Sequence, residues 1–192
     1  HESRGLGDVY KRQGKIRVIG TLWTVCTVRG IRLPHVLTKQ AMNPVECTCS
    51  CGATRFQTVG APLFRIFCHC TICQQFNNAP FADILVHRAA DVALPPATAV
   101  SFDTYKPPPN VQRGRCATCG QPAIVVFAAP VLPRLVTILR PMFGSDAELP
   151  APVAHLFYDR RVSDVDDPYP KHKGYFRSQI AFLQYLRSAR RR

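Results

Sequence analysis

The chain has 192 residues, with 25 lysines and arginines against 12 aspartates and glutamates, so its formal net charge is +13. Nine cysteines lie below the density of small disulfide scaffolds, and an odd number cannot all pair within one chain. The absence of internal repeats, heptads and long low-complexity segments from the sequence excludes repeat, coiled-coil and fibrous architectures.

The first 41 residues are predicted to lie outside the folded domain. Residues 8–13 (DVYKRQ) resemble the in-frame translation of a transposase adapter, so residues 1–13 are interpreted as a sequencing scar. The first methionine is Met42, and we predict that the natural protein begins there and that residues 14–41 are translated upstream DNA. The alternative is a signal peptide or short anchor, because basic residues precede the apolar run 18–28, which is too short to span a bilayer.

Residues 42–192 have the usual length of one domain, and strand patterns dominate their middle part. Short β-branched or aliphatic runs predict strands at residues 54–59, 63–67, 82–86, 123–127 and 135–139. One helix is predicted near the C-terminus, where an apolar stripe is formed by Phe176, Ile180, Leu183 and Leu186. The sequence therefore predicts a mainly β, mostly antiparallel domain with a short C-terminal helix.

Seven cysteines form three tight groups at strand ends and turns: Cys49-x-Cys51, Cys68-His69-Cys70-x-x-Cys73 and Cys116-x-x-Cys119-Gly120. Cysteines this close in sequence can direct their sulfurs to one point, and zinc binds each thiolate at about 2.3 Å. The groups divide into a closed four-sulfur site, typical of structural zinc, and a three-sulfur site with one open position. A disulfide framework is the alternative, but a C-x-C pair is poorly placed to bridge to itself. Zinc-bound thiolates in turn favour a reducing compartment.

Zinc binding also changes the charge of the domain. Residues 1–41 contain eight basic and two acidic residues, which leaves 17 basic and 10 acidic residues, or +7, in residues 42–192. Seven thiolates subtract seven and two zinc ions add four, which gives about +4. This modest charge suits small anionic substrates and does not require nucleic acid, and the tail at residues 190–192 is interpreted as solvated.

The three groups resemble the cysteine motifs of the glutathione-dependent formaldehyde-activating enzyme family, which also contains the centromere protein V domain. The resemblance runs from about residue 46 to about residue 174 and is carried by Cys49-Ser50-Cys51-Gly52-Ala53 and by the middle and last cysteine groups. It includes residues 76–83 and the stretch Ala154-His155-Leu156-Phe157, which is similar to the family's terminal strand.

The resemblance implies a Mss4-like barrel of coiled antiparallel strands that binds two zinc ions. The structural zinc would be held by Cys49, Cys51, Cys116 and Cys119. The second, catalytic zinc would be held by Cys68, Cys70 and Cys73.

The activity implied by the resemblance is carbon–sulfur lyase-type chemistry that joins glutathione and formaldehyde into S-hydroxymethylglutathione. We expect this chemistry in the cytoplasm, with no role for a membrane or nucleic acid. An open zinc site can lower the pKa of a bound thiol or polarise an aldehyde oxygen, and both remain possible from the sequence. A non-catalytic, zinc-stabilised binding module is the alternative. The intact three-cysteine group favours the enzyme, because a purely structural protein needs only the four-sulfur site.

Three further residues near the motifs each have more than one interpretation. Cys47 is interpreted as a bystander rather than a replacement ligand, because Gly52 fixes the register of the first pair. His69 lies between two ligands, and adjacent residues of a strand point to opposite sides, so a position behind the ligands or at the surface is favoured over metal binding. His155 is interpreted as a structural histidine rather than a catalyst.

Arginines and asparagines beside the motifs are candidate substrate contacts. Arg65, Arg113 and Arg115 can pair with the carboxylates of glutathione, although an ordinary solvated charge is the favoured interpretation of each one alone. Asn77 and Asn78 follow the middle group and can donate hydrogen bonds to a ligand, although turn formation explains them equally well.

Overall fold

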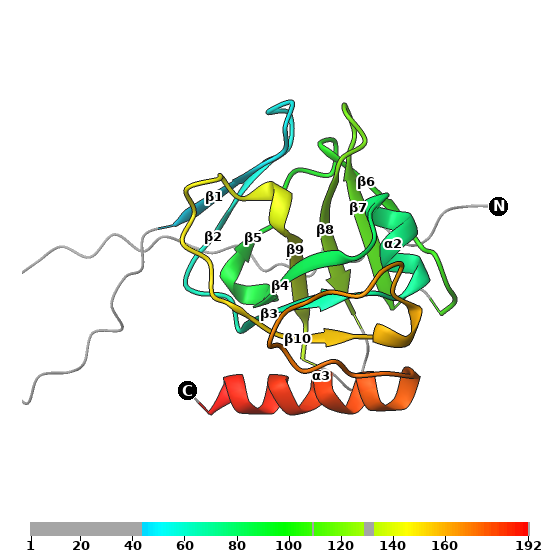
Figure 1. Ribbon diagram of the computed structural model, residues 1–192. Helices are drawn as coiled ribbons and strands as arrows, with labels where there is room; N and C mark the ends of the chain where they lie inside the picture. The colour runs from blue at the N-terminus through cyan, green and yellow to red at the C-terminus, as the bar shows by residue number, and fades with distance from the viewer. Residues whose placement is uncertain (1–43, 109, 129–132, 192) are drawn as a thin grey trace, which may run out of the picture. The chain divides into compact units, whose positions relative to one another are not determined.

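The computed structural model describes residues 44–108, 110–128 and 133–191, which all belong to one compact unit of the chain, Lys39–Arg192. The predictions made for residues 1–41 lie outside the described residues (Figure 1). Within the described part of the chain, no helix is long and apolar enough to cross a membrane.

The described residues form two β-sheets, with strand orders β1-β2-β5 and β10-β3-β4-β9-β8-β7-β6 (Figure 1). Neighbouring strands run antiparallel except for β10 and β3, which are parallel. The strands are β1 (Val45–Thr48), β2 (Arg55–Thr58), β3 (Phe64–Cys68), β4 (Ala82–Arg88), β5 (Val92–Ala93), β6 (Val100–Asp103), β7 (Val111–Cys116), β8 (Pro122–Phe127), β9 (Leu135–Leu139) and β10 (Pro152–Leu156). The helices are α2 (Thr71–Asn77), α3 (Tyr175–Arg190) and the 3-10 turns η1 (Ala89–Asp91), η2 (Arg140–Met142) and η3 (Tyr158–Arg160).

The predicted mainly β fold is confirmed, and the Mss4-like barrel remains a prediction. The five predicted strands correspond to β2, β3, β4, β8 and β9. Strand β9 is buried along its whole length because it lies between β4 and β8 in the middle of the larger sheet. The stretch that resembles the family's terminal strand overlaps β10, whose parallel pairing with β3 departs from the expected antiparallel pattern.

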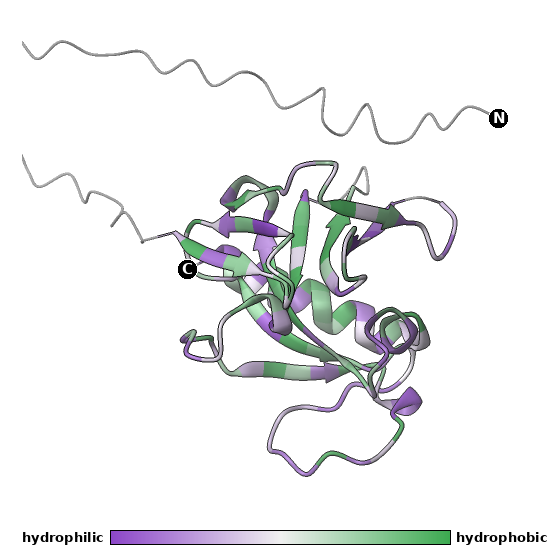
Figure 2. Ribbon diagram, turned by 90° about the horizontal axis from the view of Figure 1, so that it is seen from above, coloured by the Kyte–Doolittle hydropathy of each residue, from purple (hydrophilic) through white to green (hydrophobic). Residues whose placement is uncertain are grey.

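The core consists of two clusters that lie on opposite faces of the larger sheet. On β4, Leu85 belongs to one cluster, whereas its neighbours Ile84 and Val86 belong to the other, as alternating strand residues require. The first cluster contains Cys49 and Cys116, and the second contains Cys68. Figure 2 shows that hydrophobic residues run along the strands of this sheet. The sheet therefore separates the two groups of cysteines.

The apolar stripe predicted for the C-terminal helix was assigned to the wrong face. Within α3, Phe176 and Ile180 are 78% and 55% exposed, and Leu183 is only half-buried, so Leu186 is the one member of the stripe that is buried. The buried face instead carries Ser178 and Ala181. Apolar spacing alone could not show which face of the helix is buried, because the packed face includes small and polar residues.

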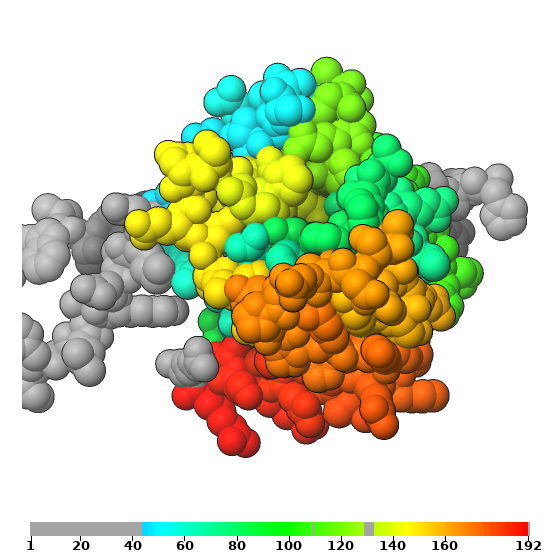
Figure 3. Space-filling view, in the orientation of Figure 1, coloured from blue at the N-terminus to red at the C-terminus, as the bar shows by residue number. Residues whose placement is uncertain are grey.

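Hydrogen bonds fix how α3 lies against the sheet. The Ser178 hydroxyl donates to the carbonyl of Gly174 at 2.7 Å and accepts from the backbone N–H of Phe157 at 2.8 Å, just after β10. Figures 1 and 3 show α3 running beneath β10, with the segment that follows β10 lying directly on the helix. A helix held in this way can cover a cavity on the sheet face that contains Cys68.

His87 on β4 gives a testable consequence of burial. It is 1% exposed, neither ring nitrogen has a hydrogen-bond partner among the described residues, and burial lowers its pKa to about 4. The unfolded chain, with a histidine pKa of about 6.5, therefore binds more protons between these values, so His87 reduces stability as the pH falls from 6.5 towards 4.

We expect the variant His87→Leu to lose less stability on acidification than the parent protein. The difference in free energy of unfolding between pH 8 and pH 5 should shrink by about 2 kcal/mol, measured by urea denaturation of both proteins. Acid effects on the cysteine groups occur in both proteins and cancel in this comparison. Equal losses in the two proteins would show that His87 is not held neutral in the fold.

Candidate metal centres

The four-cysteine cluster joins two turns from distant parts of the chain. Cys49 and Cys51 lie between β1 and β2, Cys116 ends β7, and Cys119 lies in the turn before β8. All four sulfur atoms lie within 4.8 Å of one another. Measured separations are 3.4 Å for Cys49–Cys51, 3.6 Å for Cys49–Cys116 and 3.7 Å for Cys51–Cys116. Four sulfurs bound tetrahedrally to zinc would be about 3.8 Å apart, so the cluster fits such an ion.

A glycine closes each of these two turns. Gly52 and Gly120 have φ angles of 75° and 70°, in the left-handed region that favours glycine. Their backbone N–H groups donate to the carbonyls of Cys49 and Cys116, each at 2.9 Å. The two turns therefore have the same local design, and each exposes one cysteine and buries the other.

Backbone donors around the cluster favour thiolates. The N–H of Thr54 lies 3.2 Å from the Cys49 sulfur, and the N–H of Cys119 lies 3.5 Å from the Cys116 sulfur. Burial opposes ionisation of Cys116, but hydrogen bonds from Thr54, Cys119 and Thr118 outweigh it and lower the pKa of Cys116 to about 5. Although a backbone hydrogen bond from Ala53 favours the Cys51 thiolate, hydrogen bonds with Cys119 and Cys49 outweigh it and raise the pKa of Cys51 to about 12. A cation is therefore what would allow all four sulfurs to ionise together.

The three-cysteine cluster lies where a strand gives way to a helix. Cys68 is the last residue of β3, Cys70 caps α2, and Cys73 lies in the first turn of that helix. Their sulfur atoms lie within 4.8 Å of one another. The backbone N–H of Cys73 donates to the Cys70 sulfur at 3.4 Å. Helix α2 was not predicted from the sequence, and it is the element that turns Cys73 back towards Cys68.

The three thiols strongly affect one another's ionisation. Hydrogen bonds from Cys68 and then Cys73 lower the pKa of Cys70 to about 3. Although a hydrogen bond from Cys68 favours the Cys73 thiolate, the bond to Cys70 and burial outweigh it and raise the pKa of Cys73 to about 12. Ionisation of one of these thiols therefore opposes ionisation of its neighbours. A divalent cation is what would allow all three sulfurs to ionise together.

A cavity of about 340 Å³ adjoins the three-cysteine cluster. Its walls come from β3, β4 and β7 to β10, together with α2, η3 and α3. Three cations line it, Lys106, Arg113 and Arg160, and no aspartate or glutamate is among the described residues that do so. Cys68, Cys70 and Cys73 therefore face a space that suits an anionic ligand, whereas the four-cysteine cluster lies outside it.

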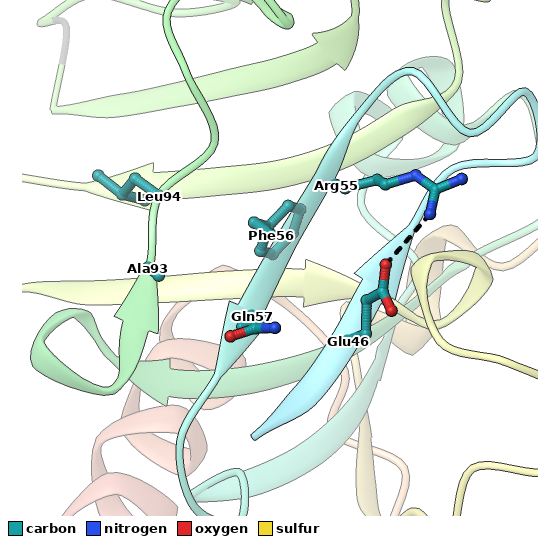
Figure 4. Close-up of a pocket in the computed structure, with 6 residues that line it drawn as sticks. All are labelled: Glu46, Arg55, Phe56, Gln57, Ala93 and Leu94. Carbon is teal, nitrogen blue, oxygen red and sulfur yellow. Dashed lines mark hydrogen bonds and ion pairs between the residues drawn. The ribbon is translucent and has the colours of Figure 1, made fainter.

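A second cavity of about 340 Å³ lies against the smaller sheet and contains no cysteine. Figure 4 shows its lining residues on β1, β2 and β5 and the loop after β5, with the exposed ion pair between Arg55 and Glu46, 3.5 Å apart, at one side. It offers no group of metal-binding or nucleophilic side chains. The candidate site is therefore the cavity beside Cys68, Cys70 and Cys73.

Two of the three candidate arginines are engaged elsewhere. Arg65 forms a two-pronged ion pair with Asp83, with N–O distances of 2.7 and 2.5 Å, and does not line the cavity. Arg115 donates to the carbonyls of Phe76 at 2.7 Å and Gly120 at 3.0 Å, so it ties helix α2 to the turn of the four-cysteine cluster. Neither arginine is left free for a ligand's carboxylate, because neighbouring oxygens already occupy its guanidinium group, and neither is an ordinary solvated charge.

Arg113 is the candidate arginine that does line the cavity. It is half-buried, and its guanidinium lies 5.5 Å from the ring centroid of Tyr105. Lys106 and Arg160 were missed from the sequence, because they lie far from the cysteine motifs and reach the cavity only through the loop before β7 and through η3. The wall supplied by α3 was missed for the same reason.

His69 and His155 form a buried pair. His69 Nε2 lies 2.8 Å from His155 Nδ1, and His155 Nε2 lies 2.7 Å from a carboxylate oxygen of Asp167. The two rings are 1% and 0% exposed, so the surface position considered for His69 is wrong. Burial lowers the pKa of His69 to about 4, so its ring is neutral near pH 7. Neither histidine lines the cavity, and both support the polypeptide behind it.

The remaining candidates have local roles. Cys47 is fully buried, lies outside both clusters, and burial raises its pKa to about 12, so it is held as a neutral thiol. Asn77 donates to the carbonyl of Cys73 at 2.8 Å. Asn78 ends α2 with a φ of 47°. Neither asparagine lines the cavity, so turn formation, one of the two interpretations left open by the sequence, accounts for them.

The family described as glutathione-dependent formaldehyde-activating enzyme matches residues 44–160, which is more than half of the chain and contains both cysteine clusters. The chain belongs to this family. The resemblance predicted from the three cysteine motifs is thus confirmed. Membership in the glutathione-dependent formaldehyde-activating family agrees with two cysteine clusters that can each hold a metal ion.

Further comparisons add little to the family assignment. No curated protein matches the chain. A crystal structure of a Rhodobacter sphaeroides protein is similar at 17% sequence identity with a TM-score of 0.43, and the match covers 53% of this chain and 90% of that one. The family assignment therefore rests on residues 44–160 and their motifs.

Proposed function

We propose that the protein is a zinc-dependent carbon–sulfur lyase-type enzyme that joins a small anionic thiol, such as glutathione, to an aldehyde. The observation that carries this proposal is that Cys68, Cys70 and Cys73 lie together at the wall of a cavity lined by cations. A cluster that served only to hold the fold together would have no need of an adjacent cavity. Family membership supports the same chemistry.

Two zinc ions per chain are proposed, one in each cluster. The four-cysteine cluster would hold a closed, structural ion. The second ion would be held by Cys68, Cys70 and Cys73, which fit it because three thiolates so close together need a compensating cation. When bound there, zinc supplies an open coordination position that lowers the pKa of a thiol ligand. A reducing compartment such as the cytoplasm would keep these sulfurs available.

The chain's own residues then bind and orient the substrates. Arg113, Lys106 and Arg160 would pair with the substrate's carboxylates, which fixes the sulfur at the cysteine end of the cavity. The cavity also holds the aldehyde beside that sulfur. The sulfur attacks the carbonyl carbon, a carbon–sulfur bond forms as the carbon–oxygen π bond breaks, and the oxygen takes the proton that the thiol gave up.

Exchange spectroscopy by NMR tests the proposed activity, because the reaction also proceeds without an enzyme. Zinc-loaded protein should accelerate the exchange between glutathione plus an aldehyde and their S-hydroxyalkyl adduct, first with formaldehyde. An amine of similar size in place of the thiol should show no acceleration. Exchange at the uncatalysed rate for every aldehyde tried would contradict the proposal, and thiol binding without turnover would favour the non-catalytic module.

A further inference from the structure

The cavity beside the three-cysteine cluster has an aliphatic floor. Ile66 lies two residues before Cys68 on β3, so their side chains project from the same face of the sheet. Ile84 is the partner of Ile66 on β4, and Leu156 is the partner of Cys68 on β10. These three aliphatic residues all line the cavity and are 3%, 8% and 3% exposed. The strand surface that lines the cavity is therefore mostly apolar, and Thr137 on β9 is a buried polar residue on it.

Apolar side chains also form the walls. Phe127 and Val111 are partners on β8 and β7, and both line the cavity. Phe182 closes the opposite side from α3, where its ring packs edge-on against Phe64 with 5.5 Å between centroids. This aromatic contact holds the helix over the sheet, so the apolar walls are part of the packed fold.

Two of the three cations occupy a different part of the cavity. Lys106 and Arg160 are exposed, and Arg113 is half-buried, whereas the aliphatic floor is buried. Lys106 and Arg160 therefore lie towards solvent and the apolar groups lie inside, whereas Arg113 lies close enough to Cys70 and Cys73 to favour their thiolates. A ligand that matches this arrangement has anionic groups at one end and an apolar group near its sulfur.

Glutathione and formaldehyde together do not supply that apolar group. Glutathione is a tripeptide whose amides would lose hydrogen bonds to water against an aliphatic floor, which opposes binding. Formaldehyde adds a single carbon to the sulfur and leaves the apolar walls without a partner. An alkyl or aryl chain attached to the carbonyl carbon would fill the same space favourably.

We propose that the preferred carbonyl substrate is an aldehyde with an apolar chain several carbons long, rather than formaldehyde. The inference rests on the proposed function and specifies its substrate class. The chemistry is unchanged: the thiol sulfur forms a bond to the aldehyde carbon, the carbonyl π bond breaks, and the thiol proton moves to the oxygen. The apolar chain stays attached to that carbon and lies on the floor formed by Ile66, Ile84 and Leu156.

Binding of unreactive product analogues tests this inference without relying on turnover. We would compare S-hexylglutathione with S-methylglutathione by titration calorimetry on the zinc-loaded full chain. Each buried methylene should strengthen binding about fourfold, so the hexyl analogue should bind at least about tenfold more tightly after its ordering cost. Equal affinity, or tighter binding of the methyl analogue, would overturn the inference.

Two substitutions on α3 provide a matched pair. Phe182→Gln places a polar group in the cavity wall and should abolish most of the preference for the hexyl analogue. Ile180→Gln, at a residue that is 55% exposed and does not line the cavity, should leave the preference intact. Val111→Thr keeps the branched shape, adds a hydroxyl to the wall, and replaces Phe182→Gln if that variant does not fold. An unchanged preference in the folded wall variant would also overturn the inference.

Turnover separates this inference from the proposed function. With glutathione, the acceleration over the uncatalysed rate should be greater for hexanal than for formaldehyde. A greater acceleration for formaldehyde would support the proposed function and overturn the inference. No acceleration for either aldehyde, together with tighter binding of the hexyl analogue, would reject the enzyme and retain the apolar ligand class.

Discussion

Replacing Cys116 by serine is expected to leave the chain without a cooperative fold. Structural zinc contributes about 10–16 kcal/mol to small metallodomains, which is comparable to the total stability of about 5–15 kcal/mol of an ordinary domain. Cys116 is 2% exposed and lies within hydrogen-bonding distance of two other sulfurs of its cluster. Thermal denaturation followed by circular dichroism should show no cooperative transition, and amide resonances should collapse to the dispersion of an unfolded chain.

Cys47 provides the matched control for this prediction. It is 0% exposed and lies two residues before Cys49, yet it belongs to neither cluster. The variant Cys47→Ala should keep its cooperative transition, with a loss of about 1 kcal/mol from the smaller buried side chain. A Cys116→Ser protein that melts within a few degrees of the Cys47→Ala protein would show that the four-cysteine cluster does not stabilise the fold through a metal.

Replacing Cys70 by serine is expected to remove the activity and one metal ion while the fold persists. Cys70 caps α2 by accepting the backbone N–H of Cys73, and serine is a favourable residue at that position, so the helix should still form. Two thiolates hold zinc less well than three. Metal analysis should therefore fall from about two to about one zinc ion per chain, and acceleration of the exchange should vanish.

The fold of the Cys70→Ser protein decides how this result is interpreted. A cooperative melting transition close to that of the parent would confirm that the three-cysteine cluster is separate from the structural one. Collapse comparable to that of Cys116→Ser would show that the second cluster also holds the fold together. The assignment of a catalytic role to Cys68, Cys70 and Cys73 would then lose its support.

Each of the three cysteine groups could be predicted from the sequence because its geometry is local. Cys116-x-x-Cys119-Gly120 specifies a turn that directs both sulfurs to one side, and glycine is needed for its left-handed backbone. Strands with strong alternation or continuous apolar character, such as β3 and β9, were predicted for the same reason. The resemblance to the family, rather than the spacing, implied that Cys49 and Cys51 share a site with Cys116 and Cys119.

The cavity could not be predicted, because it depends on contacts between distant segments. Arg65 and Arg113 are both arginines a few residues from a cysteine motif, so the sequence does not distinguish them. In the structure, Arg65 pairs with Asp83 on the neighbouring strand, whereas Arg113 lines the cavity. Arg160 and Phe182 reach the same space from segments without a recognisable motif. The buried face of α3 could not be predicted either, because Ser178 rather than an apolar residue anchors it. Tertiary packing determined each of these positions.

The most direct test of the proposed site is to count the sulfur atoms bound to zinc by X-ray absorption at the zinc edge. Seven cysteine sulfurs shared by two ions would give about 3.5 sulfurs per zinc. Because the proposal leaves one coordination position for the substrate thiol, saturating glutathione should raise the average to about 4. An average that stays near 3.5, with glutathione shown to be bound, would contradict the claim that the three-cysteine site accepts the sulfur of the substrate.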